Sequence, residues 1–197
     1  MASYEGSLMG EQGVGGIVGY AANSSGGAAT YAIKTCHARP TITCQERGGG
    51  LLGGTRLGSY DITASYTIVN FQNGGTTMGG LIGWQEHTDH NKTSINCCYS
   101  VIQGTGSIYG FIGKNETGSY VNLNDSYTSS SLTANSSSYL KMDNCQGGCT
   151  GDAIVSNLRD SGSPYINNWN LSNTFVVEAM TDKGQQNVIC PRLAWEK

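Results

Sequence analysis

Pairs of aliphatic residues enclosed by glycines recur along the chain. Residues 15–19 read Gly-Gly-Ile-Val-Gly, and the pattern returns at 49–53 and 79–83, then in weaker form at 109–113. The second glycine of the pattern advances by 34, 30 and 30 residues. A fixed period of this length is typical of proteins built from stacked repeats.

A second string recurs between copies of the first, at 33–37, 62–66, 95–99 and 123–127. Each copy has an aliphatic residue, two polar or small residues, then Cys or Ser, then an aromatic ring. Two strings that recur in register four times predict a tandem repeat over most of the chain.

A coil of about 30 residues cannot bury its own apolar side chains, whereas stacked coils align them in columns. We therefore predict an all-β fold, a right-handed parallel β-solenoid of four repeats. The two predicted columns are Ile17, Leu51, Leu81 and Phe111, and Ile33, Ile62, Ile95 and Leu123. Strict strand alternation would turn only one of the two adjacent aliphatic residues in the first string inward, and the sequence leaves open which one.

Composition agrees with this fold. Glycine accounts for 29 of 197 residues, and charged residues for only 13%, about half the roughly 25% of an average globular chain. The net charge is −3 and the basic residues are scattered, which argues against nucleic acid as a partner. No apolar run approaches the roughly 20 residues of a membrane helix, so we expect no direct membrane insertion. We also expect no cofactor.

The two strings resemble the GLUG motif, which occurs in tandem in bacterial surface and secreted proteins, including those of Bacteroidetes and the repeats associated with IgA proteases. The resemblance covers roughly residues 10–132. It implies an extracellular or cell-surface location, as part of a larger polypeptide, and a non-catalytic role. We expect an adhesin-like stalk or binding surface, with a host glycan or protein as partner.

The remaining residues are expected to cap the solenoid. We divide the chain into repeats at 1–135 and a small α+β capping segment at 136–197. A short helix is predicted from Thr150, a candidate N-cap, because Ile154, Val155 and Leu158 follow at helical spacing. The closing segment 190–196 resembles the Trp- and Pro-containing end of tandem GLUG proteins.

One loop has the residue types of a metal site. His87, Asp89 and His90 could supply imidazole and carboxylate ligands to a transition metal. Their spacing matches no established zinc signature, so we favour a solvated loop. Cys145 and Cys149, separated by Gln-Gly-Gly, are the candidates for a local disulfide, whereas Cys36 and Cys98 are expected to be buried free thiols.

The aromatic residues that end the second string predict a ladder. Tyr66, Tyr99 and Tyr127, with His37 in the first copy, could stack sugar rings if they are exposed. We favour a structural role, because Tyr66 would share the inward face of a regular strand with Ile62. The carboxylates form no ladder within the aligned strings, which argues against a catalytic site. A glycan-active β-helix enzyme (lyase or hydrolase) is therefore an alternative rather than the main prediction, and a phage tail-fibre segment is another.

Overall fold

The computed structural model describes residues 1–23, 30–73, 75–86, 92–116, 120–129, 150–155, 175–182 and 185–196. The regular structure of these residues consists of β-strands, and none of them is helical. Within this described part, no helix is long and apolar enough to cross a membrane.

Four coils follow one another, each with four strands. The first coil contains β1 (Ser3–Met9), β2 (Gln12–Gly15), β3 (Val18–Ala22) and β4 (Thr30–Lys34). The second contains β5 (His37–Thr43), β6 (Glu46–Gly49), β7 (Leu52–Arg56) and β8 (Ser59–Thr63). The third contains β9 (Tyr66–Gln72), β10 (Met78–Gly79), β11 (Ile82–Glu86) and β12 (Lys92–Asn96). The fourth contains β13 (Tyr99–Gly104), β14 (Ile108–Tyr109), β15 (Ile112–Asn115) and β16 (Tyr120–Ser129).

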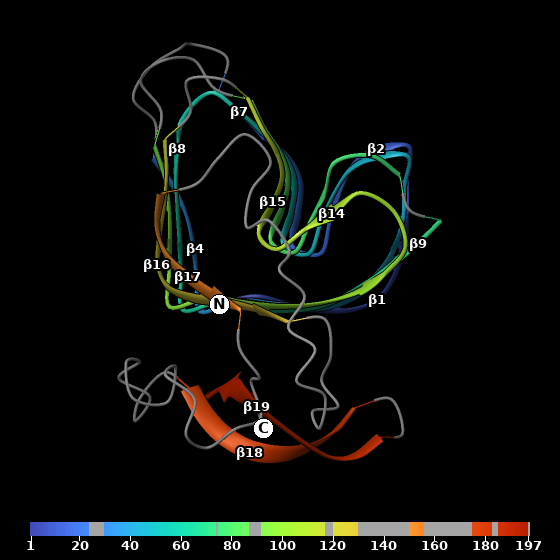
Figure 1. The fold of residues 1–197 in the computed structure, drawn as a ribbon, viewed down its shortest axis with the longest axis vertical. Helices are drawn as coiled ribbons and strands as arrows, with labels where there is room; N and C mark the ends of the chain where they lie inside the picture. Colours follow the sequence, from blue (N-terminus) through green and yellow to red (C-terminus); the bar gives the residue numbers. More distant parts are fainter. Residues whose placement is uncertain are drawn as a thin grey trace.

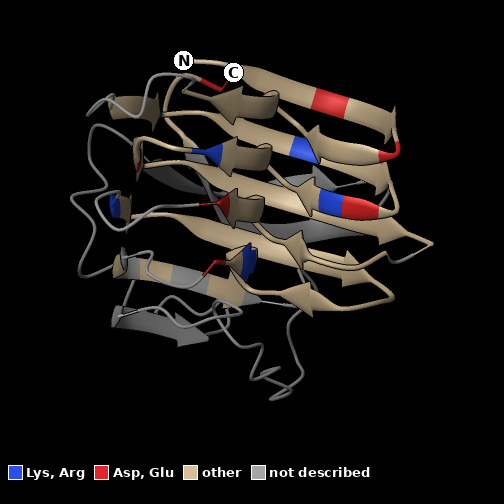
Figure 2. Cartoon of the chain, turned by 90° about the horizontal axis from the view of Figure 1, so that it is seen from above, with Lys and Arg blue, Asp and Glu red and all other residues tan. Residues whose placement is uncertain are grey.

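Equivalent strands of successive coils pair in parallel, which confirms the predicted parallel β-solenoid. One stack is β1-β5-β9-β13, a second is β2-β6-β10-β14 and a third is β3-β7-β11-β15. The fourth, β4-β8-β12, joins the first through β16, whose residues 120–124 pair with β12 and residues 127–129 with β13. The coils lie one above another in Figure 2, where few positions along the strands carry a charged residue.

Both predicted columns are present. Ile62 pairs in register with Ile33 on one side and Ile95 on the other, and Ile95 pairs with Leu123. Leu51 and Leu52 are both buried in one cluster with these residues. Strand alternation does not apply to this pair because the backbone turns between β6 and β7. There, each amide of the pair donates to the same carbonyl, that of Leu81, at 3.0 and 2.9 Å.

The glycine-rich string divides the interior into two lobes. Between the second and third stacks the backbone turns inward to the middle of the section (Figure 1). A Cβ atom on Gly50 would lie 2.7 Å from Thr67 Cγ2 on the opposite stack, and one on Gly80 would lie 2.7 Å from Ser100 Cβ. We call this close approach the pinch. It exists because only glycine leaves room for backbone to pack directly on the facing sheet.

The pinch explains why the buried side chains form two clusters. The larger lobe lies between the third and fourth stacks and includes Leu51, Ile62 and Phe111. The smaller lobe lies between the first and second stacks and includes Phe71 and Met78. Each lobe is thus a narrow column of side chains rather than one wide core.

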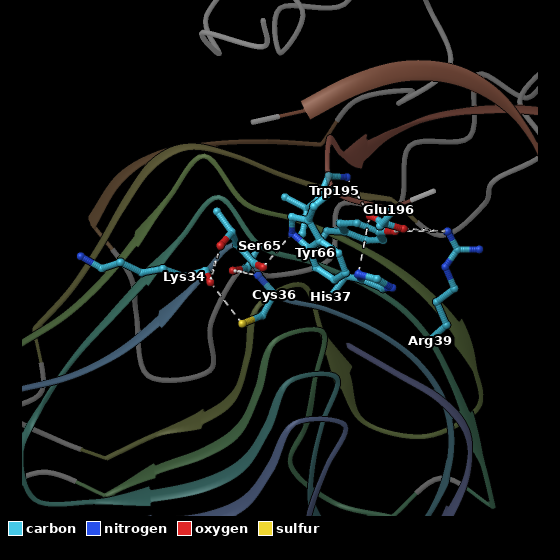
Figure 3. Close-up of polar contacts among 10 residues, drawn as sticks. Lys34, Cys36, His37, Arg39, Ser65, Tyr66, Trp195 and Glu196 are labelled. Atoms are coloured by element: carbon cyan, nitrogen blue, oxygen red, sulfur yellow. Dashed lines mark hydrogen bonds and ion pairs between the residues drawn. The ribbon is translucent and has the colours of Figure 1, made fainter. Parts of the chain in front are cut away.

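A tight corner separates the fourth stack from the first. The third residue of the second string has positive φ in three coils, at Thr35, Ala64 and Cys97. The following Ser65 hydroxyl accepts a hydrogen bond from the Cys36 amide at 3.1 Å and donates one to the Thr63 carbonyl at 2.9 Å (Figure 3). The small Cys or Ser at this position therefore satisfies backbone groups that the corner leaves unpaired.

The predicted helix at Thr150 is wrong. Residues Thr150–Val155 form β17, which pairs in parallel with β16 and so extends the solenoid sheet beyond residue 135. The edge of β16 offers unpaired backbone groups, and the β-branched Ile154 and Val155 suit a strand added to that edge. Strands β18 (Phe175–Asp182) and β19 (Gln185–Leu193) form an antiparallel pair near the C-terminus.

Candidate binding groove

Between the second and third stacks the backbone turns inward (Figure 1), and we call the outer side of this turn the notch. A pocket of about 170 Å³ lies in this notch. Residues from both stacks line it, and we call it the notch pocket: Glu46, Arg47, Thr76, Thr77, Trp84 and Lys114. Its position follows from the pinch, because the same glycines that bring the backbone inward open the surface outside it.

Arg47 and Trp84 form the central contact of the notch pocket. The Arg47 guanidinium carbon lies 3.8 Å from the centroid of the Trp84 ring, so the planar cation stacks on the indole. Arg47 has positive φ, and its backbone amide donates to the Thr77 hydroxyl at 3.0 Å. The stack and this backbone contact fix the side chain at the mouth of the pocket.

An ion pair borders the same pocket. Lys114 Nζ lies 2.8 Å from Glu116 Oε1, and the Trp84 indole N–H donates to that oxygen at 3.0 Å. The hydrogen bond from Lys114, followed by the one from Trp84, holds the pKa of Glu116 below its ordinary value. Glu116 is therefore a carboxylate at neutral pH and does not hold a proton to donate.

Tyr20 extends the aromatic surface toward the first coil. Its side chain is 43% exposed, and its ring covers Gly54, where an added Cβ would lie 2.8 Å from the ring. Tyr20, Gly54, Trp84 and Lys114 occupy one register position on the third stack. The notch thus presents two aromatic rings and a lysine along the stacking direction.

A second column beside the notch places acids on adjacent coils. Arg56 pairs with Glu86 in register, and Arg56 Nε lies 3.5 Å from Glu86 Oε1. Glu116 follows Glu86 by 30 residues and occupies the matching position on the next coil, since Gln85 and Asn115 are register partners. The aligned strings do not include these two acids, so the sequence interpretation did not place them at matching positions on adjacent coils.

The predicted aromatic ladder is present at His37, Tyr66 and Tyr99, and the two tyrosine rings are buried. The rings of His37 and Tyr66 stack at 5.1 Å between centroids, and those of Tyr66 and Tyr99 at 4.6 Å. Tyr66 and Tyr99 are 0% exposed, so neither offers an open face to a sugar ring. The Tyr127 backbone pairs in register with that of Tyr99.

The ladder lies on the outer face of the first stack, not in either lobe. The positive φ at Ala64 breaks the strand alternation that would have turned Tyr66 inward. Thr67 points inward instead, where its hydroxyl donates to the Gly80 carbonyl at 2.6 Å. The C-terminal segment covers the first part of the ladder (Figure 3).

Trp195 and Glu196 make that cover. The Trp195 indole N–H donates to the Thr35 carbonyl at 3.2 Å, and its ring lies 5.2 Å from that of His37. The Tyr66 hydroxyl donates to Glu196 Oε2 at 2.7 Å (Figure 3). Glu196 Oε1 accepts the Leu193 amide at 2.7 Å. The closing segment that the sequence assigned to a cap therefore docks beside the first corner of the solenoid.

Two charged groups complete this docking contact. Arg39 Nη2 lies 3.7 Å from Glu196 Oε2 and donates to the Tyr66 hydroxyl at 3.1 Å. His37 Nδ1 lies 3.5 Å from Glu196 Oε1 without forming a hydrogen bond. Burial lowers the pKa of His37 more than the nearby Glu196 carboxylate raises it, so the ring is neutral at pH 7.

Several predicted site residues lie outside the described part of the chain: His87, Asp89, His90, Cys145 and Cys149. Among the residues that the structure does describe, no group of three or more His, Cys, Asp or Glu side chains could hold a metal ion. Cys36 and Cys98 are buried free thiols, as expected, and Cys44 is a third.

The notch residues were not predicted, although a signal for them exists. Tyr20, Gly54, Trp84 and Lys114 are spaced by 34, 30 and 30 residues, the period of the first string. An alignment that extended the first string by a few residues would have grouped these four positions.

Comparison with protein-family models, with curated proteins and with solved structures finds no significant match.

Proposed function

We propose that this chain is a non-catalytic, extracellular repeat module of a bacterial surface or secreted protein, and that the notch is its ligand-binding surface. The module would bind a host glycan or glycoprotein, as an adhesin does. The resemblance of its repeats to GLUG motifs supports the location. The notch supports the binding role.

The single observation that carries the proposal is the half-buried aromatic and charged lining of the notch pocket, beside the exposed Tyr20 ring, on a rigid scaffold. Tyr20 and Trp84 present ring surface, and Arg47 presents hydrogen-bond donors beside them. Binding sites for carbohydrates and other small molecules combine apolar ring contacts with a few fixed polar groups. Backbone pairing between coils fixes the spacing of these groups, so binding requires little reorganisation.

A glycan-active enzyme is the second candidate, because Glu86 and Glu116 occupy matching positions on adjacent coils. Glycosidases use two carboxyl groups, one of which has a raised pKa and donates a proton. The lowered pKa of Glu116 and the ion pair between Glu86 and Arg56 oppose that role. Binding without turnover is therefore the proposal.

The test is a binding screen of the whole chain against a glycan array and a set of mucin and matrix glycoproteins. We expect at least one ligand to bind, and the double variant Tyr20→Ala/Trp84→Ala to weaken binding about tenfold or more, as loss of two ring contacts should. Met9→Ala, an exposed change on β1, is the matched control and should bind as wild type. Thermal melting checks that each variant is folded. If the double variant melts at a lower temperature than wild type, the single variant Tyr20→Ala is used as the test instead.

Retained binding in a folded Tyr20→Ala/Trp84→Ala variant would remove the notch as the ligand surface. Reducing-end release from a polysaccharide, abolished by Glu116→Gln, would establish the enzyme instead. Absence of any bound ligand across the screen would overturn the binding role and favour a stalk.

A further inference from the structure

The notch pocket has a chemical character that narrows the ligand class. Its volume of about 170 Å³ is smaller than the roughly 300–1,000 Å³ of sites that enclose a whole drug-sized ligand. It therefore suits a single ring or substituent of a longer molecule that continues along the notch.

The pocket contains a cation, Arg47, that stacking holds in place. Arg47 is held by its stack on Trp84, and within the described residues its guanidinium has no hydrogen-bond or ion-pair partner. A guanidinium presents five N–H donors in a plane that matches a carboxylate. Because stacking already restricts the side chain, little conformational entropy is lost when an anion binds.

Two further donors line the same pocket. Lys114 contributes an ammonium group that is shared with Glu116. The Thr77 hydroxyl accepts the Arg47 amide, which leaves its own hydrogen available to a ligand oxygen. Charge-assisted donors such as these form the stronger class of hydrogen bonds to a carboxylate.

The pocket also contains an acid, and this decides between classes of anion. Glu46 lines it, and Glu116 lies close enough for Arg47 to lower its pKa as well. Both carboxylates would repel a compact anion such as sulfate or phosphate. A sugar acid differs, because its hydroxyl groups can donate to Glu46 while its carboxylate accepts from Arg47.

We propose that the notch pocket is a subsite for an acidic saccharide, with the ligand carboxylate on Arg47 and Lys114 and ring hydroxyls on Glu46 and Thr77. Neighbouring sugars of the same chain contact Tyr20. This inference rests on the proposed function, since it names the ligand class of the same surface. The carboxylate can come from a hexuronic acid or from a sialic acid.

The experiment is calorimetric titration of the whole chain with four probes. They are a hexuronate oligosaccharide, its carboxyl-reduced neutral counterpart, a sialylated oligosaccharide and inorganic sulfate. We expect the hexuronate or the sialylated probe to bind, and whichever binds names the source of the carboxylate. The neutral counterpart and sulfate should bind at least about tenfold more weakly, as loss of a charge-assisted hydrogen bond implies.

Variants locate the contact. Arg47→Gln should weaken the acidic probe about tenfold or more, and Arg47→Lys should restore it only in part because lysine lacks the planar fork. Arg56→Gln is the matched control, since Arg56 lies on the same surface, pairs with Glu86 and does not line the pocket. It should change affinity less than about twofold. Unchanged melting temperatures show that each variant is folded.

The possible failures are distinguishable. Equal binding of acidic and neutral probes, with Arg47→Gln unaffected but Tyr20→Ala/Trp84→Ala impaired, overturns the acidic subsite and leaves the binding module standing. Tight binding of sulfate also overturns it. Loss of all binding to every probe and to the wider glycan screen overturns both proposals.

Discussion

Replacing Gly50 by alanine tests whether the pinch determines the stability of the solenoid. A Cβ atom there would lie 2.7 Å from Thr67 Cγ2, where ordinary contact begins at about 3.4 Å. It would also press on the Gly80 carbonyl oxygen, which accepts the Thr67 hydroxyl. Neither neighbour can turn away, because one is backbone and the other is held between two coils.

The expected cost combines three effects. Overpacking of a tight interior costs roughly 1–3 kcal/mol. Weakening the hydrogen bond from Thr67 adds about 1 kcal/mol. Alanine also reduces the entropy of the unfolded chain, which offsets about 0.4–1 kcal/mol. We therefore expect Gly50→Ala to lower the free energy of unfolding by about 1–3.5 kcal/mol, or Tm by roughly 2–14 °C for a chain of this size.

Gly54→Ala is the matched control. An added Cβ at Gly54 meets the exposed ring of Tyr20, which can swing into solvent. We expect a change within about 1 kcal/mol of wild type, measured by urea unfolding with a common m-value. If Gly50→Ala and Gly54→Ala lower the free energy of unfolding by the same amount, the close approach at the pinch does not contribute to stability as proposed.

Three further outcomes follow from the corner, the thiols and the ladder. Ser65→Ala should lower the free energy of unfolding, measured with urea, by about 1–3 kcal/mol because it leaves the Cys36 amide unpaired. Ser65→Cys should lower it less, and equal losses in the two variants would contradict this role of the hydroxyl. Burial raises the pKa of Cys98 to about 12, whereas Cys97 is only partly buried, so alkylation of native protein at pH 8 should label Cys97 before Cys98; mass spectrometry showing Cys98 labelled as early as Cys97 would refute this. Burial lowers the pKa of His37 from its ordinary 6.5, so protonation favours the unfolded chain: stability should be full above pH 6.5 and fall below it, and His37→Gln should flatten that part of a pH–Tm profile.

The coils could be predicted from sequence because their chemistry is local and repeats. Ile33, Ile62 and Ile95 fall in register in the string and in the sheet alike. The pinch could not be read from the glycine string alone, since Gly-Gly serves equally well in a turn. Its signal lies on the opposite stack, where the facing residues are all small or short: Ala38, Thr67, Ser100 and Thr128.

The misjudged elements share one physical cause, which is that backbone geometry overrides a pattern read along the chain. Tyr66 faces outward because a left-handed residue precedes it, and no alternation rule anticipates that residue at Ala64. Ile154 and Val155 lie in a strand because the edge of β16 is available to pair with them. Helical spacing in a short segment is equally compatible with a strand until the neighbour is known.

The second and third glycines of the first string, which all four copies share, also indicate which parts of a coil can change during evolution. Duplication of a unit that keeps these glycines in frame would add one coil, lengthening the notch by about 4.8 Å, the spacing of adjacent strands. The connections between the third and fourth stacks already differ in length, from two residues after β7 to seven after β3. Natural relatives should therefore vary in coil number and in these connections, while the second and third glycine positions, which are glycine in all four copies, should tolerate no side chain.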